Sequence, residues 1–180
     1  LKFTTIKSHL RSYSIYGRRS TTIANAFVSA IAPRDVYNED EIREAILFLE
    51  QDTENLTCVY CDKEADTWDH VHGLVKNKEF SGFGHVLGNI VPCCKTCNSK
   101  KGNKNWIDFL ESRPDSKKKI SLLKKYFKKY PVEKTSVKEI CPKECKQLEK
   151  LKQEILKLMK ESDDVVKVIT KKMNKLENKL

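Results

Sequence analysis

The stretch between residues 58 and 102 decides the fold, because it carries two pairs of closely spaced cysteines. It begins with Cys58-Val-Tyr-Cys61 and ends with Cys94-Lys-Thr-Cys97-Asn-Ser-Lys-Lys-Gly102. Four thiolates in two such pairs are typical of a structural zinc site, because they surround the ion completely and leave no open position. We therefore predict one structural Zn²⁺ per chain, bound by Cys58, Cys61, Cys94 and Cys97.

The chain has seven cysteines, and this odd number argues against a framework of disulfides. Residues 1–19 also lack the apolar stretch of a secretory signal. Paired thiols then indicate a reducing compartment, and we expect a cytoplasmic protein encoded by a prokaryote or a phage. The alternative for the four cysteines is a set of inert buried thiols. Cys93 is interpreted as a small core residue, and Cys141 and Cys145 as incidental.

Composition and charge narrow the class of protein. The 180 residues are 33% charged and 39% hydrophobic, which argues against a collagen or a mostly disordered chain. No apolar run approaches the ~20 residues of a membrane-spanning helix, so we expect no membrane partner. The net charge of +10 falls in residues 114–180, which carry 20 basic and 10 acidic groups. This excess favours nucleic acid over a small-molecule substrate, although a solvated helix explains it equally well.

Helical patterns precede the cysteine-rich stretch and follow it. Residues 20–32 place apolar side chains on one face and stop before a proline. Asn38 is a suitable N-cap for a second helix, with Glu41 three residues later as in a capping box. Within the stretch, residues 56–61 and 67–72 are expected to be strands, 73–88 a long loop and 98–111 a helix. Residues 120–130 predict a further, basic helix.

The last part of the chain predicts one long amphipathic helix. From Pro142 onward there is no glycine and no further proline, and apolar residues recur at spacings of three and four. They are Leu148, Leu151, Ile155 and Leu158, and then Val166, Ile169, Met173, Leu176 and Leu180. Because such a helix is longer than a small domain, we favour a short coiled coil between two copies of the chain. The alternative is that the stripe covers the chain's own core.

Three polar residues lie close to the predicted zinc site. Asp69 and His70 belong to the second predicted strand, and Asn98 follows the last cysteine directly. Asp and Asn supply the oxygen ligands that Mg²⁺ prefers. Because neighbouring residues on a strand point to opposite faces, Asp69 and His70 can address one metal and its water only where the strand ends or bends. The loop that begins at Gly73 allows such a bend.

In this order and combination, the motifs resemble the HNH nucleases, the ββα-metal fold, in their four-cysteine form. The resemblance covers residues 56–110 and rests on Cys-x-x-Cys, Asp-His, Asn and Cys-x-x-Cys-Asn-x-x-Lys-Gly. It implies that His70 is the general base that activates a water molecule and that Asp69 and Asn98 bind one Mg²⁺. It also implies that Asn89 fixes the loop that carries the base and that Lys101 contacts phosphate.

Further residues are candidates for contacts with DNA. His72 stands where many HNH nucleases have proline. It is a second phosphate contact, a competitor for the role of base, or a loop histidine without a catalytic part. His85, in the long loop, is either a contact with nucleic acid or a loop residue without a role. The basic candidates are Arg18, Arg19, Lys117, Lys118 and Lys119, followed by Lys124, Lys125, Lys128 and Lys129, and their alternative is a solvated surface.

The sequence therefore predicts an α+β fold that is mostly helical, with a small zinc-stapled ββα-metal core between N-terminal helices and a long C-terminal amphipathic helix. Residues 1–55 are expected to form a helical scaffold that contacts DNA. Residues 56–113 would form the nuclease core. Residues 114–180 would form a basic helical region that ends in the dimerisation helix.

The leading hypothesis is a Mg²⁺-dependent DNA endonuclease of the restriction type. An HNH site with one metal cuts one strand, so cutting double-stranded DNA requires two copies, and we expect a homodimer. The nearest alternative is a nicking or homing endonuclease. The alternative from another class is a zinc-stapled nucleic-acid-binding module without catalysis.

Overall fold

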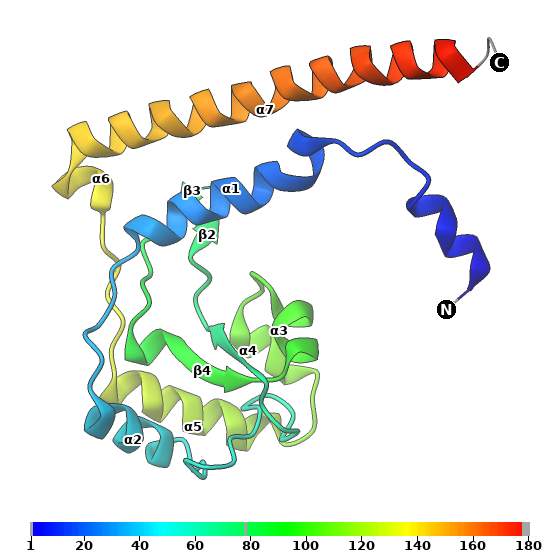
Figure 1. The fold of residues 1–180 in the computed structure, drawn as a ribbon. Helices are drawn as coiled ribbons and strands as arrows, with labels where there is room; N and C mark the ends of the chain where they lie inside the picture. Colours follow the sequence, from blue (N-terminus) through cyan, green and yellow to red (C-terminus); the bar gives the residue numbers. More distant parts are fainter. Residues whose placement is uncertain (1, 78, 178–180) are drawn as a thin grey trace. The chain divides into compact units, whose positions relative to one another are not determined.

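The computed structural model describes residues 2–77 and 79–177 and confirms the predicted class, a mostly helical α+β fold (Figure 1). The chain divides into two compact units. The terminal unit consists of Leu1–Phe27 with Cys141–Leu180, and the central unit consists of Val28–Ile140. Among the described residues, no helix is both long enough and apolar enough to cross a membrane.

The terminal unit joins the first part of the chain to its last helix. It contains the 3₁₀ helix η1 (Phe3–Ser8), most of α1 (Ile15–Ile31) and α7 (Pro142–Glu177). The carboxylate of Asp163 accepts hydrogen bonds from the Ser14 hydroxyl and from the N–H groups of Ile15 and Tyr16, at 2.6–3.2 Å. These bonds, that of Ser14 first, lower the pKa of Asp163. Because this carboxylate satisfies the first N–H groups of α1, the helix begins at Ile15 and not at residue 20 as predicted.

The long helix α7 confirms the predicted C-terminal helix, and much of its apolar stripe is exposed. The exposed members are Leu151, Ile155, Leu158, Val166, Ile169 and Met173, which we call the apolar face of α7. Leu148, the first member of the predicted stripe, is half-buried, and so are Lys152, Leu156 and Met159, which lie beside the apolar face. The apolar face therefore does not cover the core of the described chain. Leu180 and the side chain of Leu176 lie outside the described residues.

In the central unit, α2 (Glu39–Phe48) begins where the sequence predicts. Oδ1 of Asn38 accepts hydrogen bonds from the N–H groups of Asp40 and Glu41 at 3.1 and 3.3 Å, so Asn38 is the N-cap. The apolar residues Ala45, Ile46 and Leu49 are buried. The helix thus packs on the core of the central unit, as a scaffold helix should.

The sheet of the central unit differs from the predicted pair of strands. The strand β1 (Thr67–His70) pairs antiparallel with β4 (Ile90–Cys93), with His70 opposite Ile90. Residues 56–61, predicted to be a strand, form turns, because the N–H groups of Cys61 and Asp62 bond back to the carbonyl of Cys58. The predicted loop 73–88 contains the short strands β2 (Val75–Lys76) and β3 (Glu79–Phe80) and the start of the 3₁₀ helix η2 (Leu87–Asn89).

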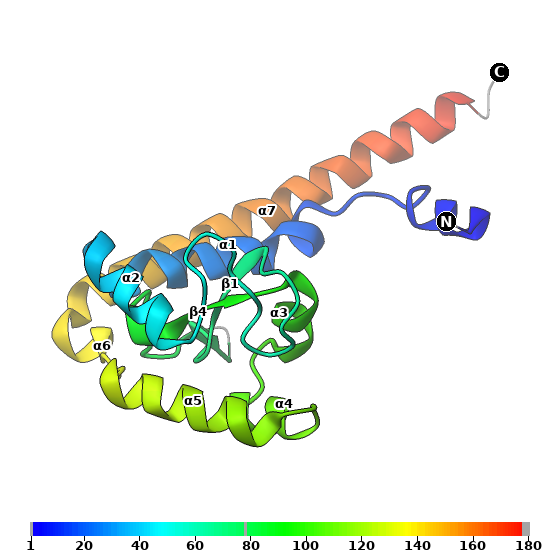
Figure 2. The same cartoon turned by 90° about the horizontal axis from the view of Figure 1, so that it is seen from below.

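The predicted helix over 98–111 is two helices, α3 (Lys95–Lys101) and α4 (Trp106–Glu111). Gly102 ends α3 with a φ of 48°, a conformation that glycine adopts without a steric cost. Asn105 then caps α4 by accepting a hydrogen bond from the N–H of Ile107 at 2.8 Å. Figure 2 shows the short α4 leading into the longer α5 (Ser116–Lys129), which α6 (Val137–Ile140) follows.

One hydrophobic cluster holds these elements together. Its most buried side chains include Tyr60 from the cysteine-containing turn, Leu110 from α4, and Leu123 and Tyr126 from α5. The hydroxyl of Tyr126 donates a hydrogen bond to the carbonyl of Leu87 at 2.7 Å. The helix α5 is therefore tied to η2, directly before β4, the strand that leads into the second cysteine pair.

Candidate functional site

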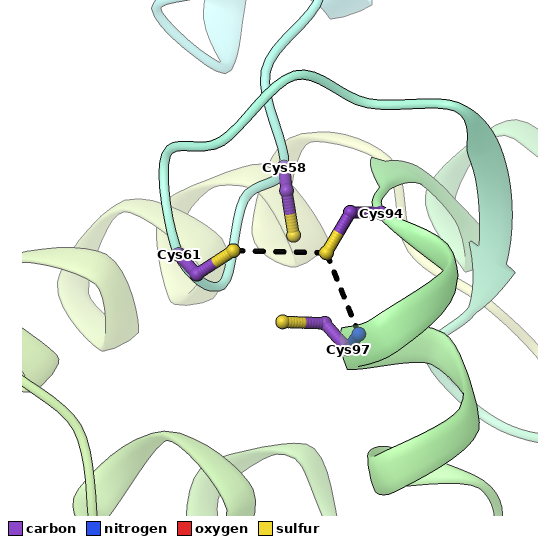
Figure 3. A group of neighbouring side chains, drawn as sticks. All are labelled: Cys58, Cys61, Cys94 and Cys97. Carbon is purple, nitrogen blue, oxygen red and sulfur yellow. Dashed lines mark hydrogen bonds between the residues drawn. The ribbon is translucent and has the colours of Figure 1, made fainter. Parts of the chain in front are cut away.

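Four cysteine sulfur atoms converge where the turn after residue 57 meets the start of α3 (Figure 3). Cys58 and Cys61 come from the turn, Cys94 is the N-cap of α3, and Cys97 lies in its first turn. The four Sγ atoms lie within 4.8 Å of one another, and those of Cys61 and Cys94 are 3.7 Å apart. A tetrahedral ion with metal–sulfur distances of ~2.3 Å separates its ligands by about 3.8 Å. The cluster can therefore hold one metal ion such as zinc.

Cys93, which is buried as predicted, lies beside the cluster and is not one of its four members. The Sγ atoms of Cys58 and Cys93 lie 3.8 Å apart, and this hydrogen bond lowers the pKa of Cys58 to about 4 and raises that of Cys93. A lowered pKa favours the thiolate, which is the form of cysteine that binds a metal. Burial raises the pKa of Cys61 and of Cys97, so both need a nearby cation to lose their protons. Arg113, with Nη1 3.3 Å from Cys97 Sγ, supplies part of this positive charge.

Asp69 lies on the face of β1 that turns into the core. It is 4% exposed, accepts a hydrogen bond from the Tyr60 hydroxyl at 2.6 Å and forms an ion pair with Lys101 at 3.0 Å. Burial and the adjacent carboxylate raise the pKa of Tyr60, so this hydroxyl stays a neutral donor. Both carboxylate oxygens of Asp69 are thus engaged within the protein, and its role as a Mg²⁺ ligand stays a prediction.

Lys101 is the cation of this buried pair and not a surface residue. It is 1% exposed, and its Nζ also donates to the backbone carbonyls of His70 and Gly102 at 3.0 and 3.3 Å. The ammonium group of Lys101 is directed at acceptors inside the protein, and its contact with phosphate stays a prediction. Its bond to the carbonyl of His70 instead fixes the end of β1.

Asn98, the second predicted Mg²⁺ ligand, is half-exposed on α3. Its Nδ2 donates a hydrogen bond to the carbonyl of Trp68 at 3.1 Å, which leaves Oδ1 as the atom that can bind a cation. Because Asp69 is paired with Lys101, the neutral amide oxygen of Asn98 is the unengaged atom of the two predicted Mg²⁺ ligands. Mg²⁺ is bound through carboxylates in proteins. The residues as they stand do not fit the predicted magnesium site.

Asn89 is placed to fix the loop that follows His70. It is fully buried, and its Oδ1 accepts a hydrogen bond from the N–H of His72 at 2.8 Å. Its Nδ2 donates to the carbonyls of His72 and Gly84 at 3.0 and 2.9 Å. One side chain thus joins the segment after β1 to the segment before η2. Asn89 acts through these backbone bonds, which makes it a positioning residue.

His70 ends β1 on the face opposite to Asp69 and is half-buried. Its Nε2 lies 2.9 Å from Nδ1 of His85, a residue that the sequence suggested either as a contact with nucleic acid or as a loop residue without a role. Burial lowers the pKa of His70, and the neighbouring imidazole of His85 adds to this effect. The imidazole of His70 is therefore neutral at neutral pH, which is the form required of a general base.

His72 lies beyond the end of β1, among aromatic rings. It stacks on Phe83 with centroids 4.5 Å apart and lies 6.3 Å from the ring of Phe127. Burial lowers the pKa of His72 as well. Of the three roles that the sequence leaves open for His72, this packing favours a loop histidine without a catalytic part.

The predicted basic contacts with DNA divide into exposed and engaged side chains. Lys117 and Lys118 are exposed at the start of α5. Lys119 is only 13% exposed and forms an ion pair with Asp62 at 2.6 Å, and its contact with DNA stays a prediction. Two further candidates are exposed on α1, in the terminal unit: Arg18 and Arg19.

Sequence reasoning missed one exposed aromatic residue beside His70. Trp68 is 47% exposed on β1 and is two residues from His70, so both side chains leave the same face of the strand. Exposed aromatic rings can stack on nucleobases. The alternation of side chains along residues 67–70 was the signal that would have found Trp68.

Comparison with protein-family models, with curated proteins and with solved structures gave no match to this chain. The functional argument below therefore depends on the residues and their geometry.

The buried pair of Asp69 and Lys101 predicts a large and asymmetric effect on stability. Lys101→Met should lower the free energy of unfolding by about 3–5 kcal/mol, because it leaves a buried carboxylate without its cation. Urea unfolding at a fixed concentration of free zinc measures this effect. The double variant Lys101→Met with Asp69→Asn should lose less than the sum of the two single variants. Lys100→Met, one residue earlier and exposed, is the matched control and should change stability by less than about 0.5 kcal/mol.

Proposed function

We propose that the central unit is the core of a DNA endonuclease of the restriction type, in which His70 is the general base. The observation that carries the proposal is the position of His70, which is half-buried at the end of β1 on the face opposite to Asp69; burial there lowers the pKa of its imidazole. The order of motifs supports it, because Asp69-His70, Asn89 and Asn98 stand around the cysteine pairs in the order that resembles the HNH nucleases.

The chemistry asked of His70 is the activation of water. Its imidazole takes a proton from a water molecule, and the resulting hydroxide attacks the phosphorus of the phosphodiester. The bond from phosphorus to the leaving sugar oxygen breaks, and this oxygen takes up a proton from solvent. The resemblance implies products with a 5′-phosphate and a 3′-hydroxyl. Trp68, on the same face as His70, is positioned to contact the substrate.

Dependence on Mg²⁺ is the part of the proposal that rests on the resemblance alone. Asp69 is closed by Lys101, so we assign no chemical step to a metal ion. Asn98, whose Oδ1 is open, stays a candidate ligand. Cleavage with and without added Mg²⁺ decides whether a cation takes part.

The ion of the four-cysteine cluster is, in this proposal, structural zinc. Four sulfur ligands fill a tetrahedral shell and leave no position for water or substrate. The ion would tie the turn at residues 58–61 to the start of α3, a helix of seven residues that is too short to be stable alone.

The apolar face of α7 is proposed to pair with a second copy of the chain. Its residues recur at spacings of three and four and are exposed, which is the pattern of a coiled-coil seam. A second copy is the occupant that the function requires, because duplex cleavage by a site that cuts one strand needs two sites.

A DNA-binding module without catalysis is the second candidate function. The ion pair of Asp69 with Lys101 favours it, because a carboxylate that is paired with a lysine is less available to bind the metal ion of a nuclease. The exposed basic side chains of α5 would serve binding in either case: Lys117, Lys118, Lys124, Lys125 and Lys128.

The proposed nuclease activity predicts cleavage of a supercoiled plasmid. With Mg²⁺, the wild-type protein should give linear DNA on an agarose gel. His70→Ala should slow cleavage by roughly 10²–10⁴-fold, because the general base is lost. His9→Ala is the matched control, since it removes a histidine of the terminal unit, and it should cleave at the wild-type rate.

Other outcomes of this experiment point elsewhere. Nicked circles without linear DNA would indicate a monomeric or strand-specific enzyme. Tight binding without cutting, in any divalent cation, would favour the binding module. Cutting that survives His70→Ala at the full rate would show that His70 is not the base.

The second prediction concerns the metal content of the purified protein. Mass spectrometry of the metal should find about one zinc ion per chain, a content set by four sulfur ligands. Cys94→Ser should lose the ion and destabilise the fold, because it removes one ligand. Cys141→Ser, outside the cluster, is the matched control and should keep it. Retention of zinc by the Cys94 variant would contradict the assignment.

The third prediction concerns the oligomeric state. Sedimentation velocity should show a dimer of the wild-type chain and a monomer of Ile155→Glu, because the new charge would be buried in the apolar seam. Lys157→Glu changes charge at a neighbouring exposed position and should remain dimeric. A wild-type monomer at micromolar concentration would refute dimerisation through α7.

A further inference from the structure

Two histidines from separate segments of the central unit meet at the end of β1. Nε2 of His70 and Nδ1 of His85 lie 2.9 Å apart, the length of a hydrogen bond between ring nitrogens. The rings stand at 76° to each other with centroids 4.8 Å apart. His85 is fifteen residues further along the chain, beyond the β2–β3 hairpin, so the contact depends on how the loop is folded.

The backbone of His85 is held on both sides by the segment before α2. Its N–H donates to the carbonyl of Pro33 at 2.7 Å, and its carbonyl accepts from the N–H of Asp35 at 3.2 Å. A Cβ atom at Gly84 would lie 2.3 Å from the carbonyl oxygen of Pro33, so only glycine allows this approach. The loop is therefore built to present His85 at one place.

The same buried amide holds both histidine segments. Asn89 bonds to the backbone of His72, two residues after His70, and to the carbonyl of Gly84, directly before His85. Lys101 holds the carbonyl of His70 itself. Because these contacts are all to backbone atoms, they place residues 70 and 85 next to each other independently of the two side chains.

The chemistry of neutral imidazole limits what this contact can be. Each ring carries one N–H and one lone pair, so one histidine must donate and the other must accept. If His85 donates, the lone pair of His70 is occupied and its other nitrogen carries a proton. If His70 donates through Nε2–H, its lone pair lies on Nδ1. Only the second arrangement leaves His70 able to take a proton from water.

We propose that His85 is a positioning residue for His70: its Nδ1 accepts a hydrogen bond from Nε2–H of His70 and so keeps Nδ1 of His70 unprotonated and oriented. When Nδ1 takes the proton of a water molecule, the O–H bond breaks and His70 becomes an imidazolium with both nitrogens protonated. Its Nε2–H then still donates to His85, a stronger bond because the donor is now charged. The catalytic role rests on the proposed nuclease function, whereas the tautomer of His70 does not.

The tautomer is measured directly by long-range ¹H–¹⁵N correlation spectra of the zinc-loaded full-length chain at neutral pH. The wild-type protein should show His70 with its proton on Nε2. His85→Ala should give a mixture of tautomers, since the acceptor is gone. His85→Gln should restore the Nε2–H form, because the Gln carbonyl can accept the same bond. A wild-type His70 protonated on Nδ1, or an unchanged tautomer in His85→Ala, would overturn the proposal.

Kinetics supply the second readout on the same variants. His85→Ala should lower kcat for plasmid cleavage by roughly 10- to 100-fold, the range for a residue that orients another, with little change in KM. His85→Gln should recover part of this loss. A rise in KM with unchanged kcat, or a His85→Gln variant as slow as His85→Ala, would show that His85 contacts DNA instead. Unchanged zinc content in each variant confirms that the fold is intact.

The two readouts separate the failure of this inference from that of the nuclease proposal. A fixed Nε2–H tautomer in a wild-type protein that does not cut DNA would refute the nuclease and leave the His70–His85 contact standing. A wild-type enzyme that cuts DNA, with His85→Ala equally fast, would refute the positioning role and leave the nuclease standing.

Discussion

The ion pair between Asp69 and Lys101 is the interaction on which the candidate site depends. Both charges are buried away from water. The structure tolerates this because the Tyr60 hydroxyl bonds to the carboxylate and two backbone carbonyls accept the remaining hydrogen bonds of the ammonium group. The pair also fixes the end of α3, because Lys101 is the last residue of this helix and bonds to Asp69 and to the carbonyl of His70 on β1. The other end of α3 carries Cys94 and Cys97 of the four-cysteine cluster. A helix of seven residues thereby becomes a rigid support for His70.

Strand geometry explains why this pair decides the chemistry. Neighbouring residues on β1 point to opposite faces, and the strand stays regular up to His70, so Asp69 turns inward and His70 turns outward. The sequence allowed both residues to face one metal only where the strand bends, and it does not bend. The outward face instead gathers His70 with Trp68, and the inward face gathers Asp69 with Lys101. The exposed chemistry of this face is therefore that of imidazole rather than of a carboxylate.

Features set by short-range rules were predictable from the sequence. The cysteine spacing predicted the four-sulfur cluster, Asn38 predicted the start of α2, and apolar periodicity predicted α7. Features set by distant partners were not. The turn at 56–61 has a strand-like composition, but bonds to the carbonyl of Cys58 close it, and β4 takes its place beside β1. The burial of Lys101 likewise depends on a carboxylate 32 residues earlier.

The site residues that the sequence did not bring together share one cause, which is that backbone groups position them. His85 is held by the carbonyl of Pro33 and the N–H of Asp35, and every residue offers such groups, so no side-chain pattern announces them. Gly84, directly before His85, is the sign of this arrangement in the sequence, because a Cβ atom there would collide with Pro33. The segment before α2, expected to be a scaffold, thus contributes backbone to the candidate site. A change in its course would move His85 away from His70 without altering any residue of the motif.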